Sequence, residues 1–139
     1  MDSLLTDIDH VAIAVRNLDE AIAWYVQTFS AEVVHREEVE HDGVSEVLMK
    51  AGDSYIQLLT PTRSSSTVAM FLDRRGEGVH HVAYRVNDCA EALTYARASG
   101  ARVIDEVPRR GSRGTTIAFL HPTCSFGTLI ELVQENLYS

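Results

Sequence analysis

The chain has 139 residues, of which 45% are hydrophobic and 23% are charged, proportions typical of a globular domain. The formal net charge of −8 at pH 7 argues against a nucleic-acid-binding protein, because phosphate recognition needs a concentrated basic surface. No apolar run has the length that a bilayer requires, and residues 1–6 lack the basic and apolar parts of a signal peptide. We therefore expect a cytoplasmic protein without membrane association.

The first predicted elements are a strand, a helix and three further strands. Apolar residues recur at helical spacing between Leu18 and Phe29, which predicts a helix with one buried stripe. Asn17 is a favourable N-cap for this helix, and Glu20 follows three residues later as in a capping box. β-branched or alternating patterns predict the strands at residues 8–15, 32–40, 44–51 and 54–60.

The second half of the chain repeats this order after a short connecting helix. We expect the connecting helix near residues 66–75, with Ser66 as its cap and Gly76 as its stop. The next helix starts after Asp88, which has a glutamate three residues later, and stops near Gly100. The corresponding strands are predicted near residues 79–86, 102–107, 114–121 and 128–134.

Sequence matches in the same order in both halves indicate an internal duplication. DHVAIAV at residues 9–15 returns as HHVAYRV at residues 80–86, and the helix starts Asn17 and Asp88 have the same spacing. Two further matches join AEVV at 31–34 to ARVI at 101–104, and IQL at 56–58 to IEL at 130–132. We therefore predict one α+β domain, residues 1–139, built from βαβββ modules at 8–63 and 77–135.

Each module carries polar residues in the middle of its first and last apolar strands. Alternation places His10 on one strand face with Ala12 and Ala14, which leave room beside the imidazole. A polar residue inside an apolar strand needs a buried partner or a ligand. A lone histidine at such a position is more often a hydrogen-bonded core or surface residue, but here the pattern is repeated. The set predicts one divalent-metal site with the ligands His10, Gln57, His81 and Glu131.

Several stretches resemble the methylmalonyl-CoA epimerases of the vicinal oxygen chelate superfamily. They are IDHVAIAV at 8–15, AIAWY at 21–25, HREEVEHDGVSEVLM at 35–49, GEGVHHVAYRV at 76–86, FLHP at 119–122 and GTLIEL at 127–132. The resemblance implies paired βαβββ modules that form a curved, half-open mixed sheet around the metal site. It also implies an acyl-CoA substrate and a homodimer.

The implied reaction is metal-dependent epimerisation at C2 of methylmalonyl-CoA or a related 2-substituted malonyl-CoA, by proton abstraction and return through an enolate. The resemblance assigns the metal ligands to the four residues above and an additional acidic residue to Glu46. We expect Glu46 and Glu131 to act on opposite faces of the carbon. Considered alone, Glu46 could equally be solvent-facing on an edge strand. The donor set does not distinguish cobalt, manganese, zinc, nickel and magnesium.

Two other functions are compatible with this fold class. One is a glyoxalase I-like lyase that acts on a glutathione hemithioacetal, although that family usually has glutamate where this chain has Gln57. The other is a metal-free protein that binds a small molecule, as drug-resistance members of the superfamily do. The complete ligand set favours the metal-dependent epimerase over both.

Three features bear on substrate contacts and on local structure. Arg109, Arg110 and Arg113 lie in a glycine-containing loop that could reach the phosphates of CoA, or could be a solvated surface loop. Relative to the epimerase pattern, Thr123 replaces a lysine, and a bulky Phe126 precedes the last strand, so a different acyl group is compatible with the sequence. The usual glycine after the first helix is replaced within Phe29-Ser30-Ala31.

Overall fold

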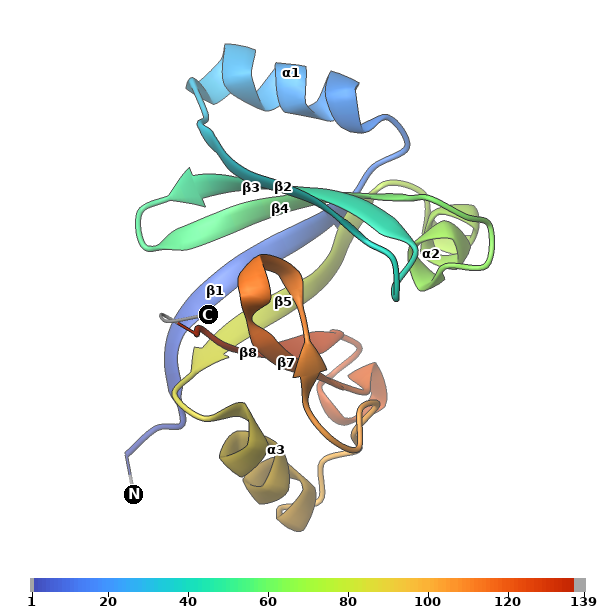
Figure 1. Cartoon of the computed structure of the whole chain (residues 1–139). Helices are drawn as coiled ribbons and strands as arrows, with labels where there is room; N and C mark the ends of the chain where they lie inside the picture. Colours follow the sequence, from blue (N-terminus) through green and yellow to red (C-terminus); the bar gives the residue numbers. More distant parts are fainter. Residues whose placement is uncertain (1, 137–139) are drawn as a thin grey trace. The chain divides into compact units, whose positions relative to one another are not determined.

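The computed structural model describes residues 2–136, and chain contacts divide the molecule into two compact units (Figure 1). The first unit is His10–His80, and the second joins the residues before His10 to those after His80. Strand β1 (Leu5–Ala14) and strand β5 (Gly78–Val86) each run through a boundary between the units. No helix in the described part of the chain is long and apolar enough to cross a membrane.

The first unit has the predicted strand, helix and three strands. After β1 come α1 (Leu18–Phe29), β2 (Val33–Val39), β3 (Val44–Ala51) and β4 (Ser54–Pro61). The strands have the order β2-β3-β4-β1, with β1 parallel to β4 and the other pairs antiparallel. Helix α1 covers one face of this sheet (Figure 1), and Leu18 packs there against Val47, Met49 and Leu58.

Helix α2 (Thr67–Arg75) is the predicted connecting helix, and it belongs to the first unit. The Ser66 hydroxyl accepts a hydrogen bond from the Ala69 amide at 3.0 Å, and the Gly76 amide donates to the Leu72 carbonyl. Val68 and Leu72 pack into a core cluster with Ala12 and Ala14 of β1. The predicted cap and stop of this helix are confirmed.

The second unit repeats the same order of elements after β5. These are α3 (Cys89–Ala98), β6 (Arg109–Arg110), β7 (Thr116–Leu120) and β8 (Ile130–Gln134), with 3-10 turns η1 (Ser112–Gly114) and η2 (Pro122–Cys124). The strand order is β5-β8-β7-β6, and β5 runs parallel to β8. Asp88 caps α3 through the Glu91 amide just as Asn17 caps α1 through the Glu20 amide. The predicted duplication into two βαβββ modules is confirmed.

One predicted strand is wrong. Residues 102–107 form only an isolated bridge, in which Val103 pairs with Leu120, and the paired strand β6 is confined to Arg109–Arg110. The side chain of Asp105 accepts the Phe119 amide hydrogen at 2.8 Å and so replaces a strand-to-strand hydrogen bond. Pro108 also lacks the N–H group that a continuous ladder would use.

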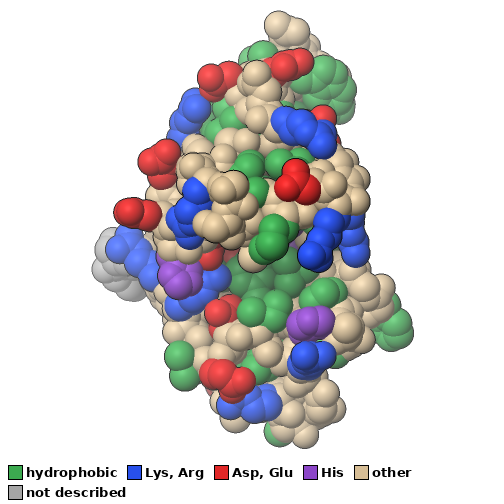
Figure 2. All heavy atoms as spheres, turned by 90° about the vertical axis from the view of Figure 1, so that its right-hand side faces the viewer, with side chains coloured by type: hydrophobic (Ala, Val, Ile, Leu, Met, Phe, Trp, Pro, Cys, Tyr) green, Lys and Arg blue, Asp and Glu red, His purple; other side chains and the backbone are tan. Residues whose placement is uncertain are grey.

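Charged side chains of both signs are interspersed on the face of the molecule drawn in Figure 2. Lys and Arg side chains lie beside Asp and Glu side chains there. This surface is therefore charged locally without one dominant sign.

Candidate active site

In the first unit, His10 lies in the middle of β1, on the strand face that also carries Ala12 and Ala14. Its side chain is buried at 5% exposure, and Ala12 and Ala14 are fully buried beside it. Ala12 is paired in register with Gln57 of the parallel strand β4. Paired residues of neighbouring strands project to the same face, so the imidazole and the Gln57 amide share one face of this sheet.

Glu46 and Gln57 form a buried hydrogen-bonded pair in the same unit. Gln57 Nε2 donates to Glu46 Oε2, and the two residues are exposed by only 3% and 4%. Strand β3 lies between β2 and β4, so Glu46 is not on an edge strand. The solvent-facing alternative for this carboxylate is therefore excluded.

The nitrogen and the oxygen of the Gln57 side-chain amide have different surroundings. Its nitrogen donates to Glu46, whereas its oxygen Oε1 is buried and has no hydrogen-bond partner among residues 2–136. A buried acceptor without a hydrogen bond lowers the stability of the folded state by about 1–3 kcal/mol unless a ligand satisfies it. An amide oxygen is also a suitable ligand for a hard or borderline divalent ion. The Gln57 oxygen therefore fits the predicted metal site.

The second unit builds the equivalent arrangement from His81 and Glu131. The two residues are 4% and 7% exposed, and His81 Nε2 lies 3.2 Å from Glu131 Oε1. Ala83 is paired with Glu131 between β5 and β8, as Ala12 is paired with Gln57 between β1 and β4. The two units thus present a histidine and an oxygen donor at matching points of matching strands.

Phe119 holds both polar residues of the second unit from one side. Its ring meets the His81 ring edge-on at 5.3 Å, and its backbone is paired with Glu131 across β7 and β8. The Arg109 guanidinium lies 5.6 Å from the centre of the Phe119 ring and 3.1 Å from Asp105 Oδ1. No local sequence pattern indicates this support, because only the strand pairing brings Phe119 to the two residues.

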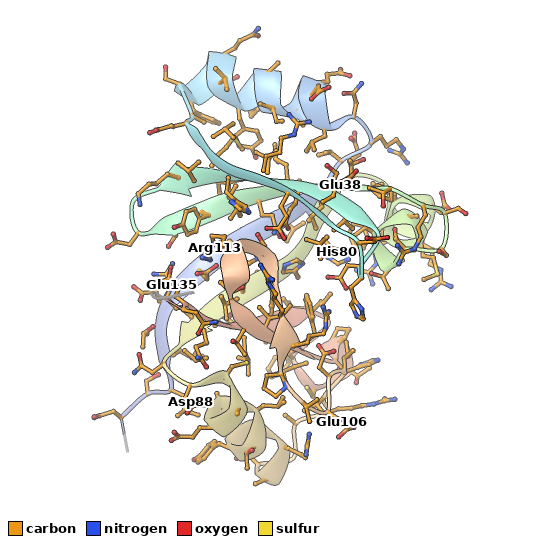
Figure 3. All side chains as sticks on the ribbon, in the orientation of Figure 1. Glu38, His80, Asp88, Glu106, Arg113 and Glu135 are labelled. Atoms are coloured by element: carbon orange, nitrogen blue, oxygen red, sulfur yellow. The ribbon has the colours of Figure 1, made fainter. Side chains whose placement is uncertain are left out.

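A second charged cluster surrounds Asp9, the residue before His10. Asp9 is fully buried, and it receives hydrogen bonds from Arg85 at 2.9 Å and from Arg113 at 2.8 Å. Arg113 also lies 3.5 Å from Glu135, and Figure 3 shows these two labelled side chains together. Two arginines of the candidate phosphate loop, Arg109 and Arg113, therefore form ion pairs within the second unit. These ion pairs give both arginines a structural role, whereas the sequence suggested either phosphate contact or a solvated surface loop.

Comparison with known proteins identifies the family. Residues 9–119 match the family model described as the glyoxalase/bleomycin resistance protein/dioxygenase superfamily. An ethylmalonyl-CoA/methylmalonyl-CoA epimerase of Cereibacter sphaeroides is 36% identical over 129 residues, which cover 91% of this chain and 96% of that protein. The chain belongs to the methylmalonyl-CoA epimerase family.

Solved structures of the epimerase family extend this match to three dimensions. Methylmalonyl-CoA epimerase from Mycobacterium tuberculosis is 40% identical, with a TM-score of 0.94 and coverage of 98% of this chain and 92% of that one. A methylmalonyl-CoA epimerase in complex with methylmalonyl-CoA and NH4+ is 42% identical, with a TM-score of 0.92 and coverage of 96% of both chains. The resemblance found in the sequence and the fold class are confirmed.

The remaining histidines of this epimerase-family chain have local contacts. The His80 ring packs edge-on against Phe71 at 5.0 Å, and His35 Nε2 lies 2.7 Å from Glu37. His121 Nδ1 accepts from the Thr123 amide and caps η2. His41 is exposed beside a turn. The contacts of His80, His35 and His121 are therefore structural.

Cys89 lies at the start of α3 and is completely buried. Burial, together with the negative charge of Glu131, raises the pKa of the Cys89 thiol to about 11. The thiol therefore stays protonated near neutral pH, and it fits a core role better than a nucleophilic one.

Proposed function

We propose that this chain inverts the configuration at C2 of methylmalonyl-CoA, or of a closely related 2-substituted malonyl-CoA. The observation that carries the proposal is the buried Glu46 carboxylate, which the Gln57 amide holds among apolar neighbours. A carboxylate in such surroundings is suited to abstract a carbon-bound proton. The substrate assignment follows relatives that are 36% and 42% identical and are named for this reaction or bind this thioester.

We also propose that the oxygen and nitrogen donors of the two units hold one divalent ion. His10, His81 and Glu131 are buried and each offers one ligand atom, and Gln57 Oε1 supplies the fourth. Duplication supports this set, since each unit contributes a histidine and an oxygen donor at equivalent positions. When bound, the ion would supply Lewis-acid stabilisation to the enolate oxygens, worth several kcal/mol.

The residues of the chain then have separate roles in moving protons. Glu46 takes the C2 proton, the C–H bonding pair passes into the enolate, and the amide of Gln57 keeps the carboxylate oriented. Glu131 returns a proton to C2 on the opposite face, from the carboxyl oxygen that would not be bound to the ion. Exchange with solvent afterwards restores the starting protonation of both groups. A well-placed general base raises the rate roughly 10²–10⁴-fold, or lowers the barrier by about 3–5 kcal/mol. Because neither the base nor the ion alone would suffice, we propose that the two act together.

We further propose a homodimer in the cytoplasm, the assembly and location expected from the sequence. This part rests on the family resemblance and would be checked by sedimentation and by fractionation. The proton chemistry described above applies to each protomer.

The test is NMR of methylmalonyl-CoA in deuterium oxide with the purified protein, before and after treatment with a chelator. We expect the C2 hydrogen to exchange, and we expect chelation to stop the exchange until a divalent ion is restored. A parallel incubation with a glutathione hemithioacetal addresses the lyase alternative. Turnover of that compound without C2 exchange would overturn the epimerase proposal, and tight binding of a small molecule without either reaction would indicate the metal-free binding protein.

A further inference from the structure

The two units have side chains of different size at equivalent points between a helix and the sheet, α1 in the first unit and α3 in the second. In the first unit the ring of Tyr25, on α1, packs with Leu18 against Met49 and Leu58. The repeat spacing that relates Asn17 to Asp88 relates Tyr25 to Ala96 and Leu18 to Cys89. The second unit therefore has a methyl group where the first has a phenol ring.

The second unit retains an open space at this point. A cavity of about 480 Å³ lies between α3 and the sheet. Its lining includes Ala92, Tyr95 and Ala96 of α3, Tyr84 of β5, Leu120 of β7 and Leu4 of the N-terminal segment. This volume lies within the range of about 300–1,000 Å³ that small-molecule sites have.

The cavity lies on the face of β8 opposite to the candidate catalytic carboxylate. Ile130 and Leu132 line it, and they flank Glu131 in the strand. Successive side chains of a strand project to opposite faces, so Glu131 points away from the cavity. A molecule bound there would not occupy the position of the thioester.

The chemistry of the lining limits the kind of molecule that fits. The walls are mostly aliphatic and aromatic, and Tyr84 and Tyr95 contribute phenol hydroxyl groups. Asp2 and Ser3 lie at the N-terminal side, and a carboxylate there disfavours an anion by charge repulsion. The thioester substrate and its phosphates are therefore unsuitable occupants.

We propose that this cavity is a binding site for a small neutral aromatic molecule with one hydroxyl group. The first unit supplies the template, because a tyrosine side chain of the chain itself fills the equivalent space there. The bound molecule would thus take the place of the phenol ring that Tyr25 supplies in the first unit and that Ala96 does not supply in the second. This inference goes beyond the proposed epimerase activity and does not depend on it.

The test uses p-cresol, which is the isolated side chain of tyrosine, and the full chain. We expect saturable binding with a Kd on the order of 1 mM, as is typical of a ligand of this size. Ala96→Tyr should fill the cavity and weaken p-cresol binding at least tenfold while C2 exchange of methylmalonyl-CoA continues. Ala98→Tyr is the matched control, since Ala98 is exposed on the same helix and does not line the cavity. It should bind p-cresol like the unaltered protein.

Intermolecular NOEs provide a measurement that does not depend on how the variants fold. Ring protons of p-cresol should give NOEs to methyl groups of Leu120 and Leu132, both of which line the cavity. Absence of saturable binding, or NOEs only to other parts of the protein, would overturn the proposal. Dissociation of an oligomer by p-cresol would also overturn it, because the occupant would then be a side chain of a second copy.

Discussion

Arg113 Nη2 lies 2.8 Å from Oδ2 and 3.0 Å from Oδ1 of Asp9, a carboxylate with no exposed surface. Arg113 makes this contact from a left-handed backbone conformation, with φ of 56°, which costs a non-glycine residue of order 1 kcal/mol or more. Asp9 is bonded directly to His10. The second unit therefore fixes the chain one residue before a proposed metal ligand.

Removal of the arginine should destabilise the protein strongly. Arg113→Met removes an arginine that shares the buried Asp9 carboxylate with Arg85, and breaking a buried pair costs about 3–5 kcal/mol. We expect a loss near the lower end of this range in urea unfolding. Arg110→Met is the control, because Arg110 is exposed in the preceding strand β6. Equal stability of the two variants would contradict the assigned role of Arg113.

Glu46→Gln should abolish most C2 proton exchange while preserving the fold. The substitution keeps a hydrogen-bonding side chain beside Gln57 but removes the base, which is worth roughly 10²–10⁴-fold in rate. Deuterium incorporation into methylmalonyl-CoA measures the effect. Glu38→Gln is the control on the neighbouring strand, since Glu38 is exposed, and it should exchange normally. An unchanged rate in Glu46→Gln would remove this residue from the mechanism.

Ser30→Gly should stabilise the protein. Ser30 ends α1 in the left-handed region with φ of 53° and ψ of 35°, where glycine is favoured because it has no Cβ. The expected gain is about 0.5–1 kcal/mol in the free energy of unfolding. Ser99→Gly is the control at the end of α3, where φ is −84°. A gain at Ser99, or a loss at Ser30, would show that backbone strain is not the relevant factor.

The two cysteines should differ sharply in reactivity. Cys124 is exposed, whereas burial raises the pKa of Cys89 to about 11. A thiol reagent at about pH 8 should therefore modify Cys124 and leave Cys89 intact in the folded protein. Peptide mapping by mass spectrometry distinguishes the sites. Rapid modification of Cys89 under native conditions would contradict its assigned environment.

The same thiol should make stability depend on alkaline pH. The pKa of the Cys89 thiol in the folded protein lies above its ordinary value of 9.0. The stability that the protonated thiol contributes is therefore complete below pH 9.0, and it is lost as the pH rises toward about 11. Urea unfolding at neutral and alkaline pH should show a larger loss for the unaltered protein than for Cys89→Ala, in which this group is absent. Equal losses of unfolding free energy in both proteins would contradict the raised pKa of Cys89.

Local sequence patterns were sufficient for most of the fold. Helix caps such as Asn17 and Ser66 act within a few residues, and strand alternation together with the repeat identified His10 and Gln57. The strand predicted at 102–107 was wrong because the Asp105 side chain competes for the Phe119 amide, and nothing near Asp105 in sequence signals this contact. The contact between Asp9 and Arg113 spans 104 residues, so no local pattern could reveal it.

The burial of Glu46 illustrates a further limit. Alternation placed it with Val44 and Leu48 but did not determine whether β3 was an edge strand. Only the pairing of β2 outside β3 shows that the carboxylate is enclosed. The family resemblance, and no local pattern, indicates a functional role for Glu46 from the sequence.

The central claim is that donors from both units hold one divalent ion. Its most direct test is a crystal structure of the protein loaded with cobalt, with anomalous diffraction collected at the cobalt absorption edge. We expect one anomalous peak per chain, bounded by His10, Gln57, His81 and Glu131. A peak coordinated by residues of a single unit, or no peak at these side chains after loading, would contradict it.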